Sequence, residues 1–241
     1  MFHTRYTICM ITIDRLIFSY PRSNFDLKIE RLEVNSGCAT AIVGPSGSGK
    51  TTLLHLIAGI LAPNSGAICV EDSVLSSLSD ADRRRFRLQN IGMIFQDFEL
   101  IEYLNVIDNV LLPCRIGNVV ELSAATKQRA EELLTQVGLK QHLRKSVTRL
   151  SQGERQRVAI CRAMLASPAI LLADEPTGNL DPVTSDQILN LLLTSVQEHN
   201  ATLVMVTHDH SLLHRFDQTV DFAQFLIPAM ELTGHAPGES A

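Results

Sequence analysis

Residues 42–59 read IVGPSGSGKTTLLHLIAG, in which a glycine-rich turn ending in a lysine follows a short run of small apolar residues. Such a turn is unfavourable in conformational entropy unless another group must come close to the backbone. Residues 44–51 fit the pattern G-x-x-x-x-G-K-[ST], in which backbone N–H groups and the N-terminus of the following helix bind the phosphates of a nucleotide. The stretch therefore predicts a strand, a phosphate-binding turn and a helix, in that order.

The chemistry of this turn depends on two side chains at its end. Lys50 is expected to reach the β- and γ-phosphates, and Thr51 is expected to ligate Mg²⁺. The predicted nucleotide-binding residues of the turn are Gly44, Pro45, Ser46, Gly47, Ser48, Gly49, Lys50, Thr51 and Thr52. The alternative is a flexible loop that matches by accident, which happens in roughly one chain in a hundred of this length. The position of the turn between a buried strand and a helix favours the nucleotide.

The composition is that of one ordinary globular domain. The chain has 241 residues, 45% of them hydrophobic, and a formal net charge of −5. This charge gives no general attraction to nucleic acid, so we expect no nucleic-acid partner. No stretch approaches about 18 uninterrupted apolar residues and no cleavage site follows the start, so we expect neither a membrane span nor a signal peptide. The five scattered cysteines, never spaced C-x-x-C, favour free thiols in a reducing cytoplasm.

Hydrophobic periodicity predicts an α/β fold. Residues 8–20 and 25–34 alternate apolar and polar side chains, which predicts two strands joined by a turn at 21–24. Further strands are predicted at 39–43, 66–72, 91–96, 169–174 and 202–207, and helices at 51–58, 80–89, 184–199 and from His210. Residues 97–165 are mainly helical in pattern, which predicts a helical subdomain inserted in the core. The alternation of strands and helices elsewhere predicts a parallel sheet with helices on its faces.

An apolar strand at residues 169–174 ends in two adjacent carboxylates, Asp174 and Glu175. Asp174 stands where a P-loop enzyme places the acid that holds Mg²⁺, usually through a coordinated water. Glu175 points to the other side of the chain, where it could polarise a water for in-line attack on the γ-phosphate. Solvated acids at a strand end are the common interpretation of such a pair. The phosphate-binding turn makes the catalytic interpretation the better one.

Residues 150–181, LSQGERQRVAICRAMLASPAILLADEPTGNLD, resemble the ATP-binding cassette (ABC) ATPases, and the resemblance extends over about residues 8–220. The family's other motifs are present in order: a glutamine after a strand (Gln96), a signature (LSQGE, 150–154), a D-loop (Asn179, Leu180 and Asp181) and a switch histidine (His208). The resemblance implies a P-loop NTPase (RecA-like) core with an N-terminal antiparallel β subdomain and an α-helical subdomain at about 97–165. It implies an ATP-binding domain over residues 1–232, and we expect the small, polar tail at 233–241 to be disordered.

In this family two cassettes clamp two ATP molecules face to face, so that each nucleotide lies between the phosphate-binding turn of one chain and the signature of the other. The resemblance implies that Ser151 and Gly153 contact the γ-phosphate across that interface and that Asp181 crosses to the partner chain. Tyr20 matches the aromatic residue that stacks on adenine. A core tyrosine in a strand is the alternative for Tyr20.

The resemblance also implies a catalytic set of Glu175, His208 and Gln96. His208 would hold the γ-phosphate and sense its loss. Gln96 would join Thr51 and Asp174 as a metal ligand and would link the metal site to the helical subdomain. The sequence H-D-H at 208–210, with His214 four residues on, offers a separate metal site as an alternative, but no partner residue with metal-binding spacing accompanies it.

Two residues of the signature depart from the family's pattern. Gln152 replaces the first glycine of the signature pair, and Glu154 replaces the usual glutamine. Because Ser151 and Gly153 are retained, we expect altered kinetics at most. The region after His208 lacks the Asp-Gly hairpin that the family often has near its end, so the C-terminal boundary stays open.

The remaining question is which cassette protein the chain resembles. Lys50 and Ser151 are about 100 residues apart without sustained heptads, which argues against the repair and condensation types. A single cassette argues against the ribosome-bound types. We therefore predict a transporter ATPase subunit that uses ATP and Mg²⁺, forms a homodimer, and is held on the cytoplasmic face of the membrane by an integral membrane subunit.

Within the transporters, FQDFELIEYLNVIDNVLLP and DEPTGNLD resemble the LolD/MacB/FtsE-like branch, which serves lipoprotein release and macrolide export. The ATPase subunit of an amino-acid-type importer is the alternative, and a soluble P-loop kinase or regulatory module is a further one. The cargo and the direction of transport are not encoded here, because in this architecture the membrane partner meets the substrate.

Overall fold

The computed structural model describes residues 9–22, 25–116, 120–178 and 180–225. The predicted disordered tail at 233–241 and Asn179 of the D-loop lie outside these ranges, as do residues 23–24 of the predicted turn and residues 226–232 of the predicted domain. Within the described ranges, no helix is both long enough and apolar enough to cross a membrane.

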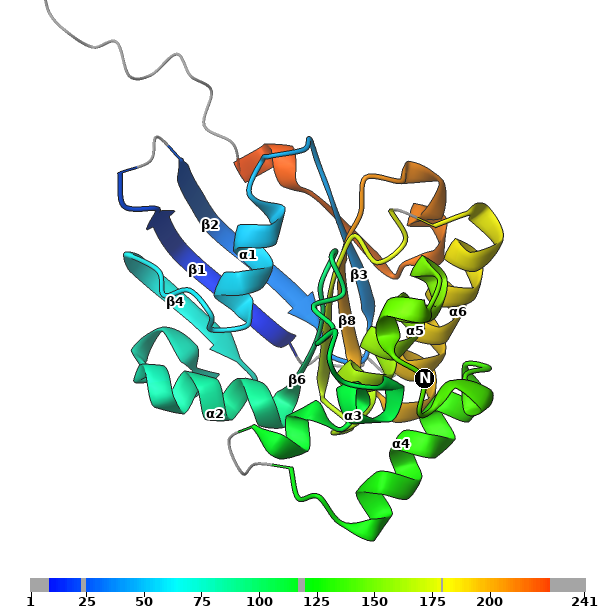
Figure 1. The fold of residues 1–241 in the computed structure, drawn as a ribbon. Coiled ribbons are helices and arrows are strands. Elements are labelled where there is room, and N and C mark those ends of the chain that lie inside the picture. The colour runs from blue at the N-terminus through cyan, green and yellow to red at the C-terminus, as the bar shows by residue number, and fades with distance from the viewer. Residues whose placement is uncertain (1–8, 23–24, 117–119, 179, 226–241) are drawn as a thin grey trace, which may run out of the picture.

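An antiparallel sheet of four strands forms the N-terminal part of the fold, with the order β2-β1-β4-β5 (Figure 1). Its strands are β1 (Cys9–Ser19), β2 (Asp26–Asn35), β4 (Ser65–Val70) and β5 (Ser73–Val74). In β2 the apolar residues Leu27, Ile29, Leu32 and Val34 are buried while polar residues between them are exposed. The alternation is interrupted once, where Glu30 and Arg31 are both exposed, and on either side of this point it is the signal that predicted the strand, because successive side chains point to opposite faces.

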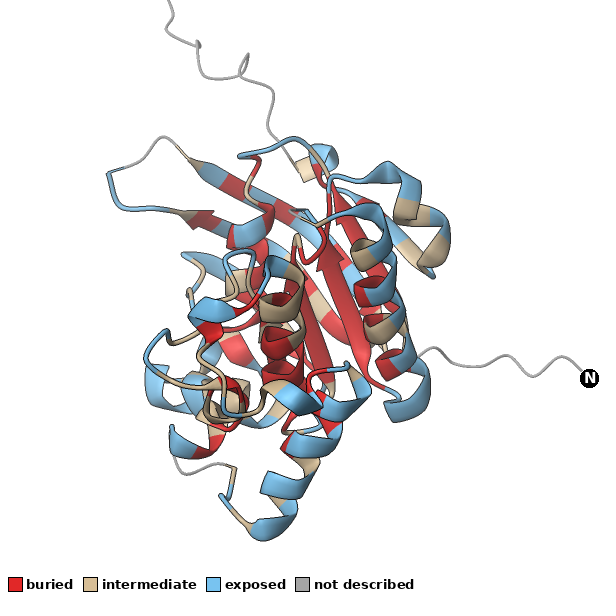
Figure 2. Ribbon diagram, turned by 45° about the vertical axis from the view of Figure 1, so that its right-hand side comes forward, coloured by how far each residue is buried: buried red, intermediate tan, exposed pale blue. Residues whose placement is uncertain are grey.

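A parallel sheet of five strands, in the order β6-β7-β8-β3-β9, forms the centre of the molecule. Its strands are β3 (Ala39–Val43), β6 (Ile91–Ile94), β7 (Ile170–Asp174), β8 (Thr202–Val206) and β9 (Gln218–Asp221). Every residue of β3, β7 and β8 is buried, and Figure 2 shows these central strands in the colour of buried residues. Helices cover both faces of such a sheet, so its strands are apolar throughout.

The edge strand β9 was not predicted. The helix expected from His210 is a 3-10 helix, η5 (His210–Arg215), and it ends before β9 begins. β9 pairs in parallel with β3, with Thr40 opposite Gln218 and Val43 opposite Asp221. Only Val220 of this short strand is buried, so the sequence QTVD carries too little periodicity to indicate a strand.

The helices are divided between the sheet faces and the inserted region. The α-helices are α1 (Lys50–Ile57), α2 (Asp80–Asn90), α3 (Val106–Val110), α4 (Ala124–Gln136), α5 (Gln152–Met164) and α6 (Pro182–His199). The other 3-10 helices are η1 (Leu75–Ser77), η2 (Leu112–Arg115), η3 (Lys140–His142), η4 (Val147–Arg149) and η6 (Phe222–Phe225). Residues 97–165 thus hold α3, α4, α5 and three 3-10 helices, joined by loops.

Two apolar clusters lie on opposite faces of the parallel sheet. Ile170 and Leu172 of β7 belong to the cluster that includes α1 and the antiparallel sheet. Leu171 and Ala173 belong to the cluster that includes α3, α4, α5 and α6. The helices of residues 97–165 therefore share their apolar core with one face of the parallel sheet.

The five cysteines are all free thiols, as the sequence predicted. Cys114 and Cys161 are buried, and the other three are partly exposed. Burial raises the pKa of the Cys161 thiol to about 12, so this residue acts as a small apolar side chain.

Candidate active site

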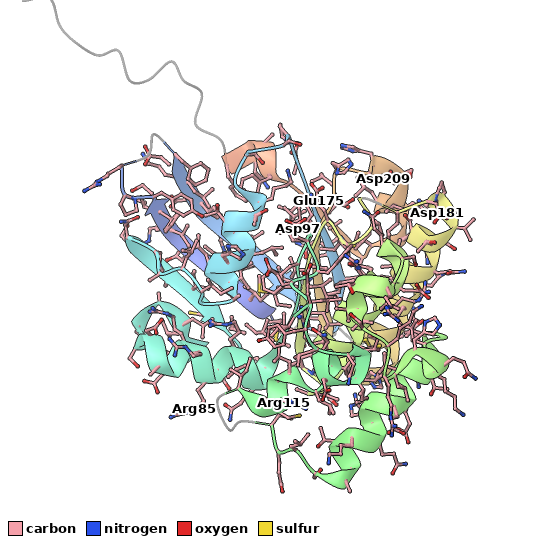
Figure 3. All side chains as sticks on the ribbon, viewed as in Figure 1. Arg85, Asp97, Arg115, Glu175, Asp181 and Asp209 are labelled. Atoms are coloured by element: carbon pink, nitrogen blue, oxygen red, sulfur yellow. The ribbon has the colours of Figure 1, made fainter. Side chains whose placement is uncertain are left out.

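Several of the predicted site residues follow the carboxyl ends of the parallel strands. The phosphate-binding turn follows β3, Glu175 follows β7, and His208 follows β8. Parallel strands end at the same edge of a sheet, which is where open α/β folds bind their ligands. Figure 3 shows Glu175, Asp181 and Asp209 along this edge of the molecule. The edge is the candidate active site.

Glycine is required in the phosphate-binding turn for two reasons. Gly47 and Gly49 have φ angles of 73° and 107°, in the region that other residues rarely adopt. A Cβ on Gly49 would lie 2.5 Å from Cζ of Phe25, so a side chain would also collide with that ring.

The turn also holds a polar atom without a partner. The hydroxyl of Ser48 is buried and has no hydrogen-bond partner within the described chain. A buried polar atom without a partner, at a helix N-terminus, fits a cradle for an anionic ligand.

Lys50 lies inside this cradle and not in solvent. Lys50 is only 5% exposed. Its Nζ donates hydrogen bonds to the carbonyl oxygens of Gly44 at 2.9 Å and Pro45 at 2.7 Å. An ammonium group has three donor hydrogens, so one remains for a phosphate oxygen while the other two hold the turn.

A cavity of about 550 Å³ lies beside the turn and brings most of the predicted residues together. Its lining residues are Tyr20, Phe25, Ser46, Gly47, Gly49, Lys50, Thr51, Thr52, Gln96, Glu175 and Val206. Gln96 reaches the cavity because β6 ends at Ile94 and leaves it in the following loop. The phosphate-binding turn, Gln96 and Glu175 therefore face one space.

Two aromatic rings, those of Tyr20 and Phe25, line this cavity. Tyr20 follows β1 and is 37% exposed, which favours base stacking over the core alternative. Its hydroxyl lies 3.1 Å from Oγ1 of Thr52, and its ring centroid lies 5.7 Å from that of Phe25. Phe25 was not among the predicted site residues. The available signal was a second aromatic residue just across the predicted turn.

The two carboxylates at the end of β7 occupy different environments. Asp174 is 6% exposed, and burial raises its pKa above the ordinary aspartate value. A hydrogen bond from Thr51 opposes this increase, while the charge of Glu175 adds to it. Glu175 has a left-handed backbone, with φ of 44°, and its N–H donates to the carbonyl of Val206 at 3.0 Å. Such backbone is uncommon outside glycine and clusters at active sites.

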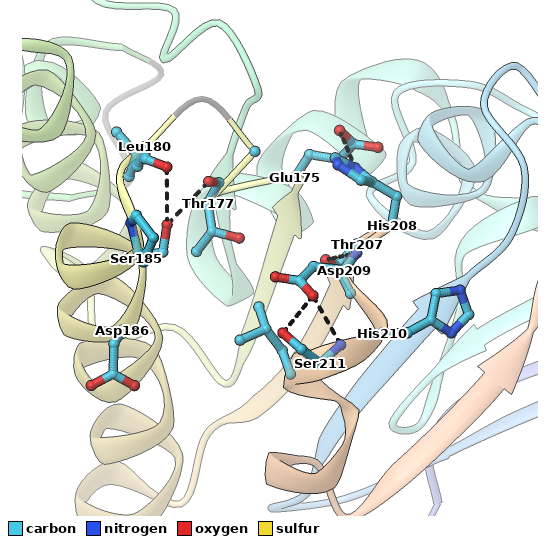
Figure 4. A pocket seen from close by; sticks show the side chains of 13 residues that line it. Glu175, Thr177, Leu180, Ser185, Asp186, Thr207, His208, Asp209, His210 and Ser211 are labelled. Carbon is cyan, nitrogen blue, oxygen red and sulfur yellow. Dashed lines mark hydrogen bonds and ion pairs between the residues drawn. The ribbon is translucent and has the colours of Figure 1, made fainter.

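Glu175 also lines a second cavity, of about 640 Å³, on the side of His208 (Figure 4). Nδ1 of His208 lies 3.1 Å from Oε2 of Glu175, and Figure 4 shows the imidazole turned toward this carboxylate. His208 and Glu175, the predicted switch histidine and general base, are therefore direct partners, although they are 33 positions apart in the sequence.

The neighbouring histidines do not form a second cluster. Asp209 accepts hydrogen bonds from Ser211, which lower its pKa, and Nδ1 of His214 contacts the carbonyl oxygen of Ser211. Within the part of the chain that the structure describes, no group of three or more His, Cys, Asp or Glu side chains is arranged to hold a metal ion.

The signature residues lie outside both cavities of the single chain. Ser151 is the N-cap of α5, and Asp181 is the N-cap of α6, where it accepts hydrogen bonds from Val183 and Thr184. Hydrogen bonds from Thr184 are the main cause of the lowered pKa of Asp181. The chain therefore does not bring Ser151, Gly153 and Asp181 to its own phosphate-binding turn.

Gly153 connects the signature to the first turn of α6. A Cβ on Gly153 would lie 2.8 Å from Cγ2 of Thr184, which is closer than packed carbon atoms approach. Oγ1 of Thr184 donates to Oδ2 of Asp181 at 2.6 Å, so its side chain has a fixed orientation. Thr184, which the sequence analysis did not identify, thus connects the signature with the residue that caps α6.

We expect Gly153→Ala to lower ATP turnover by about tenfold, because overpacking by one methyl group costs roughly 1–3 kcal/mol and displaces α5 or Thr184. Thr184→Ser removes Cγ2 and keeps the hydroxyl that bonds Asp181. The double variant should therefore regain most of the lost activity, as measured by phosphate release. A double variant as inactive as Gly153→Ala would contradict the steric explanation.

Comparisons with known proteins identify the family of this chain. A family model described as ABC transporter matches residues 27–178. The chain is 41% identical over 202 residues to the lipoprotein-releasing system ATP-binding protein LolD of Hydrogenovibrio crunogenus (strain DSM 25203 / XCL-2), covering 83% of this chain and 87% of that protein. It is 43% identical over 187 residues to the uncharacterized ABC transporter ATP-binding protein YbbA of Escherichia coli (strain K12), covering 78% and 81%.

Solved structures give the same result. The dimeric structure of a post-hydrolysis state of the ATP-binding cassette MJ0796, bound to ADP and Pi, matches with a TM-score of 0.80 and 31% sequence identity. The match covers 88% of this chain and 94% of that one. The predicted fold class, with a P-loop α/β core and an antiparallel sheet, is thereby confirmed.

Proposed function

This chain belongs to the ABC transporter family, and on that premise we propose that it is the ATP-hydrolysing subunit of a transporter of the lipoprotein-release or macrolide-export type. The similarity to LolD over most of both chains supports this branch. The single observation that carries the activity is that Lys50, Thr51, Gln96 and Glu175 face one cavity. A soluble kinase is the weaker reading, because it has no use for the signature.

The phosphate-binding turn would hold the triphosphate of ATP. Lys50 would donate to the phosphate oxygens, and the N–H groups at the start of α1 would do the same. Thr51, Asp174 and Gln96 would hold Mg²⁺, which neutralises charge on the phosphate oxygens when it is bound. The hydrogen bond between Thr51 and the buried Asp174 supports this pairing of ligands. Tyr20 would stack on the adenine ring.

Hydrolysis would take place between two chains. Ser151 and Gly153 of one chain would bind the nucleotide held by the other, because in the single chain they lie away from its own cradle. Glu175 would accept a proton from the attacking water, and His208 would orient this carboxylate from 3.1 Å while contacting the γ-phosphate. Loss of that phosphate would then release the two chains.

The conformational change caused by ATP would be transmitted from the site through the segment that follows Gln96. The guanidinium of Arg162, on α5, donates to the carbonyl oxygens of Phe98 and Glu99. Both of those residues have positive φ angles, 63° and 48°, so the segment has a defined shape that Arg162 holds. A movement of this segment would therefore be transmitted to α5, whose first turn is the signature.

A groove of about 300 Å³ beside this segment would receive the membrane partner. Ile60, Leu88 and Ile116 supply apolar lining, and Arg87 and Glu99 supply charge. Such a lining suits an amphipathic helix, and we assign the groove to a cytoplasmic helix of the integral membrane subunit. This partner would hold the chain on the cytoplasmic face of the membrane.

Capture from native membranes tests this function. A tagged Glu175→Gln variant would be incubated with ATP and Mg²⁺ in mild detergent, and the proteins that co-purify would be identified by mass spectrometry. A membrane protein with few helices and a large extracytoplasmic domain supports the proposed branch. A multi-helix permease with a solute-binding protein would favour an importer, and capture of no membrane protein would overturn a transport role.

We expect Ile116→Asp to lose at least about tenfold of this co-purification while ATPase activity of the isolated chain stays unchanged, because a charge buried in an apolar contact costs several kcal/mol. Ile116 is 46% exposed in the single chain, so the change does not disturb the core. Leu122→Asp is the matched control, because Leu122 is 42% exposed and does not line the groove. Equal losses in both variants would argue against the groove.

A further inference from the structure

The first turn of α5 is ordered by a reciprocal capping box that includes one of the two departures from the family's signature. Oγ of Ser151 accepts a hydrogen bond from the N–H of Glu154 at 3.3 Å. Oε2 of Glu154 accepts one from the N–H of Ser151 at 2.7 Å. The side chain of Ser151 also hydrogen-bonds to the Glu154 carboxylate, so this hydroxyl is held inside the capping box with an orientation that Glu154 sets.

The same arrangement places a negative charge in the signature. Hydrogen bonds from the backbone and the side chain of Ser151 lower the pKa of Glu154, and the neighbouring His142 and Lys145 lower it further. A carboxylate in the first turn of a helix interacts with the positive end of the helix dipole. That end is also what would attract the phosphate of a nucleotide. Glu154 therefore orders the turn and at the same time weakens its attraction for an anion.

His142 lies against this carboxylate from outside the helix, where a protonated imidazole would offset its charge. Its Nδ1 lies 3.1 Å from Oε1 of Glu154, and the two side chains are 30% and 20% exposed. Arg155 does not serve in this way, because its guanidinium donates to the carbonyl oxygens of Val147 and Thr148, each at 3.0 Å. The imidazole of His142, in η3, is thus in direct contact with the charged residue of the signature turn.

We propose that the Glu154–His142 pair sets how strongly the signature turn (residues 150–154) binds the nucleotide held by a second chain. Glu154 acts as a positioning residue that aims the hydroxyl of Ser151, and His142 compensates its charge. This inference rests on the proposed function, since it takes the ligand of the turn to be ATP on a partner chain. It gives a role to a residue that, in the sequence, was only a departure from the family's pattern.

The test measures ATP-dependent dimerisation of chains that all carry Glu175→Gln. Analytical ultracentrifugation would give the fraction of dimer at each of a range of ATP concentrations. Glu154→Ala loses the hydrogen bond from the Ser151 N–H, although Ser151 still caps the helix, and should raise the ATP concentration for half-maximal dimerisation by about fivefold. Glu154→Gln keeps the capping bonds without the charge and should lower it by about twofold to fivefold. His142→Ala should raise it by a similar factor, because the carboxylate is left uncompensated.

The double variant decides between charge and structure. In the Glu154→Gln background, His142→Ala should have no further effect, because the carboxylate it compensates is gone. The ATP affinity of the dilute single chain and the midpoint of thermal unfolding should stay within error of the parent for Glu154→Gln and His142→Ala. A Glu154→Gln variant that behaves like Glu154→Ala, or an undiminished effect of His142→Ala in the double variant, would overturn the proposal. If the parent does not dimerise with ATP at all, the proposed function itself fails.

Discussion

Replacing Glu175 with glutamine is expected to lower the rate of ATP turnover by about 10²–10⁴-fold, while ATP binding is retained. The carboxylate faces the nucleotide cavity, and its Oε2 lies 3.1 Å from Nδ1 of His208. A glutamine side chain has the same size and keeps a hydrogen-bonding oxygen, but it cannot take a proton from water. With ATP present, the two chains should therefore stay associated, which sedimentation and phosphate release would measure together.

A matched control for this variant lies on the surface of α6. Glu198→Gln makes the same chemical change at an exposed position away from the nucleotide cavity, and its turnover should equal that of the parent protein. Full turnover in Glu175→Gln would remove the general base from this mechanism. Loss of turnover together with loss of ATP binding would instead indicate that Glu175 is needed to build the cavity.

Replacing Lys50 with alanine is expected to weaken ATP binding by roughly 10–100-fold, because a hydrogen bond to a charged group contributes roughly 1.5–3 kcal/mol. The loss has two physical parts. The donor to the phosphate oxygens is removed, and so are the two bonds from Nζ to the carbonyl oxygens of Gly44 and Pro45 that hold the turn. Titration with a fluorescent ATP analogue would measure the affinity.

The comparison for this variant is Lys127→Ala, which removes the same charge from an exposed position on α4. Its ATP affinity should be that of the parent, because a distant exposed charge is screened by solvent and salt. An unchanged affinity in Lys50→Ala would remove the phosphate-binding turn from the site. An unchanged midpoint of thermal unfolding in both variants would exclude unfolding as the cause of any loss.

Features that depend on neighbouring positions could be read from the sequence. The phosphate-binding turn is one continuous segment, and its glycines, lysine and threonine report a local backbone requirement. The long strands β1 and β2 and the apolar strands β7 and β8 were predicted because burial on a sheet leaves a period of two or a continuous apolar run. The alternation of these elements predicted a parallel sheet with helices on its faces, and the resemblance to the ABC ATPases supplied the rest of the fold class.

Other features required the folded chain. The strand β9 exists because β3 offers it a partner, and its own four residues give no such signal. The contact of Glu175 with His208, the collision that would occur between Phe25 and a side chain at position 49, and the packing of Gly153 on Thr184 all join distant segments. No pattern of spacing records which of those segments meet.

The sequence by itself determined that this protein has the motifs of a nucleotide-hydrolysing cassette, because each motif is a short run whose backbone needs are local. Only the tertiary structure decided how those motifs act on one another. It showed that Glu154, a departure in sequence, completes a helix cap and lies beside His142. Contacts of this kind depend on the packing of helices and strands against a shared core, which position along the chain does not encode.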